Sequence, residues 1–265
     1  MTEMKPYEII STAIEQYQPN YVFGLFSGGH DSLCACHIAS KHPSFNGCVH
    51  INTGIGIEET RDFVRATCET QGWPLIEVGP DETYENLVVD QGFPGPGHHW
   101  KMYQRLKERA LRKILREFRD PDNRSRKIVF VSGRRRRESK RRMRTTTEAI
   151  TTGLKNPSPR IVWVNPIIDW DGGDKNRYID ENDLDTNPVV EKLCMSGECL
   201  CGAFASPGEL NEIRMFYPDA AEEIDRIAAL AREAGVPSRW GERPTPQAPP
   251  NQIEMPLCWS CEAIP

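Results

Sequence analysis

Long apolar runs and export signals are missing from the sequence. No window approaches the roughly 18 consecutive apolar residues of a membrane-spanning helix. The first residues, MTEMKPYEII, contain neither the basic region nor the apolar region of a secretory signal. The 265 residues, with 38% apolar and 27% charged side chains, suit one large soluble domain, with or without a small appendage. We therefore expect a cytoplasmic protein that has no membrane partner.

An overall positive charge is also missing. The net charge of −5 argues against a general nucleic-acid binder. Between Arg124 and Arg144, however, eleven lysines and arginines occur with a single acidic residue, Glu138. This stretch carries +10, so the rest of the chain carries −15. Such a distribution predicts one anion-binding site, although a solvated basic helix would also account for it.

The nine cysteines do not indicate a disulfide scaffold. The chain is large and shows no secretory signal, so a reducing compartment is the better expectation. Four of the nine lie in apolar stretches and are expected in the core: Cys34, Cys36, Cys48 and Cys68. The other five lie late in the chain and are candidates for a function: Cys194, Cys199, Cys201, Cys258 and Cys261.

Alternating strand and helix patterns predict the fold. Short apolar runs predict strands at residues 20–27, 47–52, 74–78, 127–133 and 160–167. Helical patterns occupy residues 31–42, 59–72, 99–119, 206–217 and 219–234. The alternation predicts an α/β fold with an open, parallel, five-stranded, Rossmann-like sheet covered by helices on both faces. We place a boundary near residue 190, with an α/β domain over 1–190 and a helical, cysteine-rich segment with a Pro-rich tail over 191–265.

The most specific motif follows the first predicted strand. The turn into the next helix reads Ser27-Gly28-Gly29-His30-Asp31-Ser32. Its backbone N–H groups and the helix N-terminus can turn toward a bound anion, the serine hydroxyls can donate to phosphate oxygens, and Asp31 suits Mg²⁺. The G-K-[ST] of a Walker A loop is absent. A glycine turn with Asp31 as the helix N-cap is the alternative.

This string resembles the PP-loop of the ATP pyrophosphatase superfamily. Other motifs are similar to the phosphoadenosine phosphosulfate (PAPS) reductase-like branch: G-x-R-x-x-E-S-x-x-R at 133–142, N-P-I-x-D-W at 165–170, Y-I at 178–179 and N-P at 187–188. The D-T-G…E-T pattern of that branch is matched at 52–54 and 59–60, with Asn52 in place of aspartate. The resemblance covers roughly residues 20–202.

The resemblance implies an adenine nucleotide alpha hydrolase-like fold. It also implies an enzyme that cleaves ATP between the α and β phosphates. The residues it assigns to nucleotide and Mg²⁺ binding are Ser27, Gly28, Gly29, His30, Asp31, Ser32, Thr53, Gly54, Gly133 and Arg135. The expected catalytic residues are Asp31, Ser32, Arg135 and Arg142. Arginine suits this role because its planar fork binds phosphate or sulfate in a bidentate way. About half of the other basic side chains in this stretch are expected to face water.

The five late cysteines predict a metal centre. Their spacing, C-x₄-C-x-C and later C-x₂-C, offers five thiols for a four-thiolate site. Spacing alone does not choose between iron–sulfur and zinc. The resemblance favours a [4Fe–4S] cluster held by four of the five, with zinc as the alternative. Ligation by three cysteines with one open iron, and thiols without any metal, are further alternatives.

One motif of the sulfonucleotide reductases is missing. Those enzymes resemble one another in a C-terminal E-C-G-x-H segment with a nucleophilic cysteine, whereas the last residues here read CWSCEAIP. They also tend to degrade the S-G-G-x-D-S string, which this chain keeps whole. Both departures favour an enzyme that uses ATP.

A predicted basic helix offers a surface for nucleic acid. Residues 99–119 contain eight lysines and arginines against two acids. With His98, His99 and Trp100 nearby, the helix could follow a phosphate backbone and stack a base. The alternative is an ordinary helix whose apolar stripe, including Tyr103, packs in the core while its cations face water.

Three functions are consistent with these patterns. The first is an ATP pyrophosphatase that adenylates a nucleic-acid or other anionic substrate for sulfur transfer, as in DNA phosphorothioation or tRNA thiolation. It would work with a cysteine desulfurase as sulfur donor and with further subunits of a modification complex. The second is a PAPS or APS reductase in which Cys258 or Cys261 attacks sulfur. The third is a non-catalytic nucleotide- or redox-sensing subunit.

Overall fold

The computed structural model describes residues 4–120, 122–123, 126–138, 148–152 and 160–241. Its centre is a six-stranded sheet in the order β3-β2-β1-β4-β6-β5. The strands are β1 (Tyr21–Leu25), β2 (Phe45–Ile51), β3 (Leu75–Val78), β4 (Ile128–Val131), β5 (Ile150–Thr152) and β6 (Ile161–Val164). The first four and β6 pair in parallel, as predicted, and form the α/β sheet.

The sixth strand is the difference from the predicted sheet of five parallel strands. Strand β5 has three residues and pairs antiparallel with β6, Ile150 opposite Val164. Two of its three residues are threonines, so it has no apolar run that a sequence pattern could reveal. It lies at the end of the strand order, where a short strand is typical of a sheet edge.

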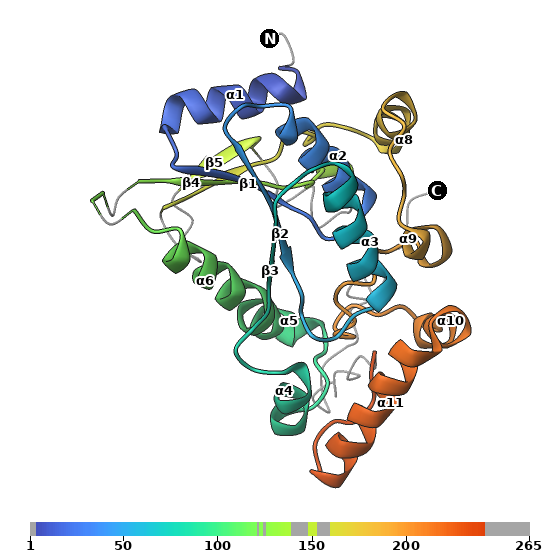
Figure 1. Cartoon of the computed structure of the whole chain (residues 1–265). Coiled ribbons are helices and arrows are strands. Elements are labelled where there is room, and N and C mark those ends of the chain that lie inside the picture. The colour runs from blue at the N-terminus through green and yellow to red at the C-terminus, as the bar shows by residue number, and fades with distance from the viewer. Residues whose placement is uncertain (1–3, 121, 124–125, 139–147, 153–159, 242–265) are drawn as a thin grey trace, which may run out of the picture.

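Helices cover both faces of the sheet, as predicted (Figure 1). Helices α1 (Pro6–Tyr17) and α2 (His30–Ser40) lie on one face, and α6 (Arg109–Glu117) lies on the other. The other helices are α3 (Glu58–Thr70), α4 (Tyr84–Gln91), α5 (His99–Met102), α8 (Gly172–Glu181), α9 (Pro188–Leu193), α10 (Glu209–Phe216) and α11 (Pro218–Glu233). Helices α1, α4, α8 and α9 were not predicted from the sequence.

The alternation of side chains along β1 explains the two covered faces. Val22 belongs to the core cluster under α1 and α2, and the next residue, Phe23, belongs to the cluster under α6. Burial on both faces accounts for the near-continuous apolar runs of these strands. Gly24 lets α2 approach closely, because a Cβ there would lie 2.6 Å from Cys36 Sγ.

The helix predicted over 99–119 is one helical stretch with an irregular middle. Helix α5 is followed by a π-helical segment, Tyr103–Glu108, and then by α6. The extra residue per turn in a π-helical segment changes the direction in which the side chains of the next helix point, and such segments are frequent at functional sites. Leu106, Ala110 and Ile114 of the predicted apolar stripe are buried.

The C-terminal helices pack against the loop after β2 and against α4. A separate core cluster combines Ile55, Leu87 and Leu106 with Val189 and Ile224. The boundary near residue 190 stays a prediction. Within the described part of the chain, no helix is long and apolar enough to cross a membrane.

The strand order places a crevice beside β1. The sheet grows in one direction from β1 to β2 and β3, and in the other from β1 to β4 and β6. In open α/β sheets, ligands bind outside the carboxyl ends of the strands at such a switch point. The segments that come directly after β1 and β4 therefore form the first candidate site.

Candidate nucleotide site and cysteine segment

The phosphate loop, residues 27–32, joins β1 to α2 as predicted. Gly28 has φ +75°, and Gly29 is the N-cap of α2. The Ser32 hydroxyl donates to the Gly29 carbonyl at 2.7 Å and accepts from Ser27 N–H at 3.2 Å. Only glycine adopts the Gly28 conformation without strain, so the loop geometry depends on it. The open N-terminus of α2 then points its first N–H groups to the loop, as an anion site requires.

Gly133 packs directly against this loop. A Cβ on Gly133 would lie 2.4 Å from the Asp31 carbonyl oxygen and 2.6 Å from Ser32 N. The segment after β4 and the start of α2 therefore touch backbone to backbone. The structure thus gives the predicted site residue Gly133 a steric role at the switch point.

Arg135 and Asp31 form an ion pair across the switch point. Arg135 Nε donates to Asp31 Oδ1 at 2.8 Å, and the two side chains are 11% and 24% exposed. The pair brings one predicted anion-binding residue and the predicted Mg²⁺ ligand together. Its partial burial orients the guanidinium beside the phosphate loop. Arg142 lies outside the described residues.

The other arginines of this motif have partners outside the loop. Arg136 forms an ion pair with Asp169, and Arg137 Nη1 lies 3.9 Å from Asp171 Oδ2. The Arg134 guanidinium lies over the Trp163 ring at 5.5 Å from its centroid. Half-exposed pairs of this kind contribute little to stability, so these residues shape the surface more than they hold the fold.

A cavity of about 580 Å³ opens over the phosphate loop. Its polar wall contains Ser27, Gly29, His30, Asp31, Ser32, Gly133 and Arg135. Its apolar wall contains Leu25, Val49, Ile51, Leu111 and Trp163. An apolar wall beside a few converging polar groups is the arrangement that holds a flat base at one end and phosphates at the other.

Helix α8 adds a lysine that the motifs did not indicate. Lys175 lines the cavity beside His30. Burial, with the positive charge of Lys175, lowers the pKa of His30, so this imidazole is neutral at pH 7. Of these two neighbouring side chains, Lys175 therefore supplies the positive charge in the cavity, and His30 supplies none. The sequence pattern weakens after residue 170, so no signal indicated this helix or its lysine.

Asn187 of the N-P pair supports the phosphate loop from behind. It is fully buried, and its Nδ2 donates to the Gly28 carbonyl at 3.0 Å and to Thr60 Oγ1 at 3.1 Å. Its Oδ1 accepts from Val189 N–H at 2.9 Å, which caps α9. One side chain thus links α9, α3 and the loop.

Thr53 and Gly54, assigned to the nucleotide by resemblance, line a different hollow together with Asn52 and Glu77. Thr53 is buried, and its Oγ1 donates to the Glu198 carbonyl at 2.8 Å. In this structure Thr53 holds the chain segment of the late cysteines. Its assignment to the nucleotide stays a prediction.

The cysteine segment, residues 194–201, lies between two cavities. Cys194 lines the cavity over the phosphate loop. Cys199 and Cys201 line a second cavity of about 290 Å³, and Tyr103, Lys107 and Met195 line both cavities. The hydrogen bond from Cys201 outweighs burial and lowers the pKa of Cys199. His99, predicted near the site, lines the second cavity and lies 4.6 Å from the Phe204 ring.

The described residues do not assemble the predicted metal centre. Cys199 and Cys201 line the same cavity, but the described ranges contain no group of three His, Cys, Asp or Glu residues placed for a metal ion. Cys258 and Cys261 lie outside the described residues. Two thiols would supply half of a four-thiolate site, so the metal centre stays a prediction.

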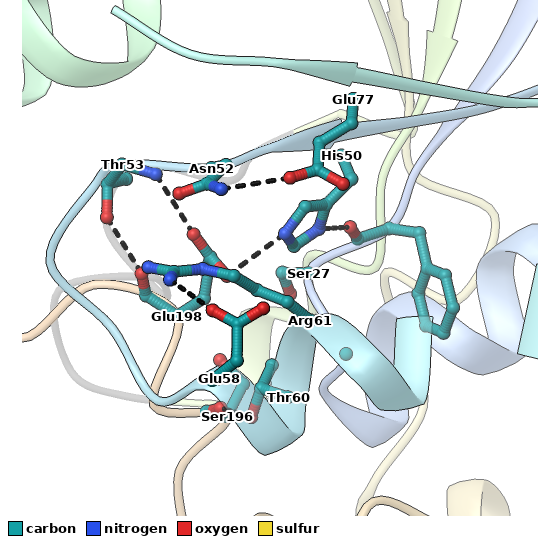
Figure 2. Close-up of polar contacts among 12 residues, drawn as sticks. Ser27, His50, Asn52, Thr53, Glu58, Thr60, Arg61, Glu77, Ser196 and Glu198 are labelled. Carbon is teal, nitrogen blue, oxygen red and sulfur yellow. Dashed lines mark hydrogen bonds and ion pairs between the residues drawn. The ribbon is translucent and has the colours of Figure 1, made fainter. Parts of the chain in front are cut away.

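A buried histidine and glutamate connect the cysteine segment to the end of β1 (Figure 2). His50 Nδ1 donates to the Phe26 carbonyl at 2.8 Å, and Nε2 lies 3.0 Å from Glu198 Oε2. A neutral imidazole has one N–H, which Nδ1 uses for Phe26, so Nε2 carries a proton toward Glu198 only when His50 is charged. Burial opposes charge on His50, but the hydrogen bond and charge of Glu198 raise its pKa. The sequence patterns indicated neither residue, because burial of a glutamate has no sequence signal.

Acidic residues neutralise much of the basic helix. Arg105 Nη1 lies 2.7 Å and Arg109 Nη1 3.7 Å from Glu82 Oε2, and Lys113 Nζ lies 2.7 Å from Asp81 Oδ1. These pairs leave a weaker basic surface than the residue count of 99–119 indicates. Trp100, however, is 59% exposed beside this surface.

The comparisons with known proteins agree with this geometry. Over 241 residues, 88% of this chain and 86% of the relative, the chain is 22% identical to a PAPS reductase of Photorhabdus laumondii. Over 223 residues, 82% of this chain, it is 26% identical to an uncharacterized protein of Methanocaldococcus jannaschii, of which it spans 50% of the length.

A solved structure and a family model extend the comparison. PAPS reductase from Candida auris in a phosphate complex aligns with 71% of this chain and 85% of its own, with a TM-score of 0.53 and 20% identity. This likeness supports the fold. The model of the phosphoadenosine phosphosulfate reductase domain matches residues 21–202, from the first residue of β1 to just past the cysteine segment. The phosphate loop, the Arg135 motif and the cysteine segment all lie inside that match, and the chain belongs to this domain family.

Proposed function

We propose that this protein is an ATP pyrophosphatase that adenylates an anionic substrate for sulfur transfer, within nucleic-acid modification. The observation that carries the proposal is the cavity in which an intact phosphate loop, Arg135 and Lys175 meet an apolar wall. A nucleoside triphosphate needs both parts, one for its base and one for its phosphates.

The proposed reaction is a displacement at the α-phosphorus of ATP. A substrate oxygen attacks that phosphorus, the bond to the β-phosphate oxygen breaks, and pyrophosphate leaves with the electron pair. The loop N–H groups, the Ser27 and Ser32 hydroxyls, Arg135 and Lys175 stabilise charge on the leaving group. Asp31 lines the cavity and would hold Mg²⁺, which adds positive charge there.

Four of the five late cysteines would hold the proposed [4Fe–4S] cluster, with zinc as the alternative. Cys199 and Cys201 fit as a pair, and Cys194 lies apart in the nucleotide cavity. A bound cluster would supply iron that can take part in sulfur chemistry, whereas a bound zinc ion would only cross-link the cysteine-containing segments.

The test is product analysis with protein purified without oxygen. ATP, Mg²⁺ and sulfide, as the nucleophile that displaces AMP from the adenylated substrate, are supplied with DNA, with tRNA or without nucleic acid, and pyrophosphate and AMP are measured. Equal amounts of both products, increased by one of the nucleic acids, are expected. ADP and phosphate, or ATP binding without turnover, would contradict the proposal, and the second result would favour a sensing subunit.

A PAPS or APS reductase is the second candidate. The family model and the Photorhabdus relative favour it, and Cys194 brings a thiol into the nucleotide cavity. The same protein is therefore incubated with PAPS or APS and a dithiol reductant, and sulfite is measured. Sulfite release without pyrophosphate release from ATP would replace the first proposal with this one.

A further inference from the structure

Backbone hydrogen bonds fasten the cysteine segment to the loop after β2. Ile57 N–H donates to the Gly197 carbonyl at 2.9 Å, and Leu200 N–H donates to the Ile55 carbonyl at 2.9 Å. These two bonds hold the segment in register with the loop. They do not reach the phosphate loop, so they do not set the position of one relative to the other.

The side chain of Glu198 makes that connection (Figure 2). It is 3% exposed and lines the nucleotide cavity. Its Oε1 accepts from Thr53 N–H at 3.1 Å, and its Oε2 lies 3.0 Å from His50 Nε2. His50 continues to the carbonyl of Phe26, the residue before the phosphate loop, at 2.8 Å. One chain of two hydrogen bonds and an ion pair thus runs from Thr53 and the cysteine segment, through Glu198 and His50, to the start of that loop.

A second connection meets the phosphate loop two residues later. Ser196 accepts from the Thr60 hydroxyl, Thr60 accepts from Asn187 Nδ2 at 3.1 Å, and Asn187 Nδ2 reaches the Gly28 carbonyl at 3.0 Å. Ser196 also packs on the loop, since a Cβ on Gly29 would lie 3.6 Å from its Cβ. The two connections hold the loop at both sides of Ser27.

We infer that Glu198 is a positioning residue that couples the phosphate loop to the cysteine segment. Through His50 and Thr53 it sets where Cys194 and Ser196 stand relative to a bound nucleotide. The inference rests on nucleotide binding in the proposed site, but on neither candidate reaction. Nucleotide binding at the phosphate loop then reduces the motion of the cysteine segment, and a coupling free energy links the two sites.

Three variants separate positioning from simple loss of burial. Glu198→Ala removes the connection. Glu198→Gln keeps it, because the amide oxygen can accept from Thr53 and the amide nitrogen can donate to the neutral His50 Nε2. His50→Gln keeps a partner for Glu198 but loses the bond to Phe26, so it cuts only the end at the phosphate loop. Glu77→Ala is the control for loss of a carboxylate near His50, because Glu77 pairs with Asn52 and Arg65 and acts on His50 only through its charge.

The measurement is amide hydrogen exchange with and without nucleotide, on the full chain. The probe is whichever of ATP with Mg²⁺ or PAPS binds the wild-type protein more tightly by calorimetry. We expect nucleotide to slow exchange of residues 196–201 on the order of fivefold in the wild type, Glu198→Gln and Glu77→Ala. Glu198→Ala and His50→Gln are expected to bind nucleotide and to lose most of this slowing, because only the second connection, through Asn187, remains.

Three results would overturn the inference. One is slowing that persists at the wild-type extent in Glu198→Ala or, if that variant does not fold, in His50→Gln. Another is a wild-type segment whose exchange does not respond to bound nucleotide. Loss of the slowing in Glu198→Gln as well would also count against it, because that variant keeps both contacts. Absence of pyrophosphate release with normal coupling would reject only the proposed reaction.

Discussion

At the scale of single residues, Lys175 and Asn187 are the two positions whose roles at the phosphate loop are most directly tested by substitution. Lys175 reaches the nucleotide cavity from α8, a helix that shows no clear pattern in the sequence. Asn187 is part of a recognisable N-P pair, but only the structure shows that it holds the Gly28 carbonyl. The motif identifies Asn187 but not the group that it binds, because the Gly28 carbonyl lies 159 positions away in the sequence.

Lys175→Ala is expected to raise the KM for ATP about tenfold with a smaller effect on kcat, because a phosphate contact contributes about 1.4 kcal/mol. The matched control is Arg177→Ala on the same helix, whose side chain is 66% exposed and pairs with Asp174. Steady-state pyrophosphate release measures both. Equal KM values for the two variants would exclude Lys175 from phosphate binding.

Asn187→Ala is expected to lower the free energy of unfolding by about 1–3 kcal/mol, because it leaves buried polar groups without partners. It also frees the Gly28 carbonyl, so ATP should stabilise the variant less than the wild type. Urea unfolding with and without ATP gives both quantities. Asn211→Ala, an exposed side chain that accepts from Arg214, serves as the control. Unchanged stabilisation by ATP would show that the loop keeps its shape without Asn187.

At the scale of elements, α2 and α8 meet through polar contacts. His37 Nδ1 lies 2.9 Å from the Tyr178 hydroxyl, which also accepts from Lys41 Nζ at 3.2 Å. Burial, then the charge of Lys41, lowers the pKa of His37 from 6.5 to about 4. The sequence pattern predicted α2 but not α8, and the contact between the two helices depends on the fold.

This pKa predicts acid sensitivity. Between pH 6.5 and about 4 the unfolded chain binds a proton at His37 that the folded protein rejects. Stability therefore rises with pH across this window and is lost as pH falls through it. In His37→Gln the fall in stability from pH 6.5 to 4 should be shallower than in the wild type, by urea unfolding at a series of pH values. Parallel curves would contradict the assignment.

At the scale of the whole molecule, thiols from distant parts of the chain are proposed to meet at one metal. Among the described residues, Cys199 and Cys201 line one cavity, and Cys194 lines the other, over the phosphate loop. We therefore expect brown protein with about four irons per chain when it is purified without oxygen.

The cysteine variants sharpen this prediction. A Cys199→Ser, Cys201→Ser double variant is expected to lose most of the iron, and Cys194→Ser to keep it. Visible absorption and iron and sulfide assays measure both. Colourless protein with about one zinc per chain would indicate a structural zinc site in place of the cluster. Protein without metal would contradict the predicted metal centre.

Much of the fold was predictable because it depends on local patterns. The apolar runs of β1, β2, β3, β4 and β6 have the length and composition of strands buried on both faces. Strand β5 was not predictable, since a three-residue edge strand is defined by its partner. The π-helical segment after α5 was also hidden, because its six residues are too few to alter the helical pattern of the whole stretch 99–119.

The sequence by itself determined the α/β fold, the phosphate loop and the family, because these depend on short runs of residues with strong local preferences. Only the tertiary structure decided that Arg135 pairs with Asp31, that Thr53 faces Glu198, and that Cys194 lines a different cavity from Cys199 and Cys201. These contacts join residues more than 100 positions apart. Their geometry comes from how helices and loops pack on the sheet, which no local pattern contains.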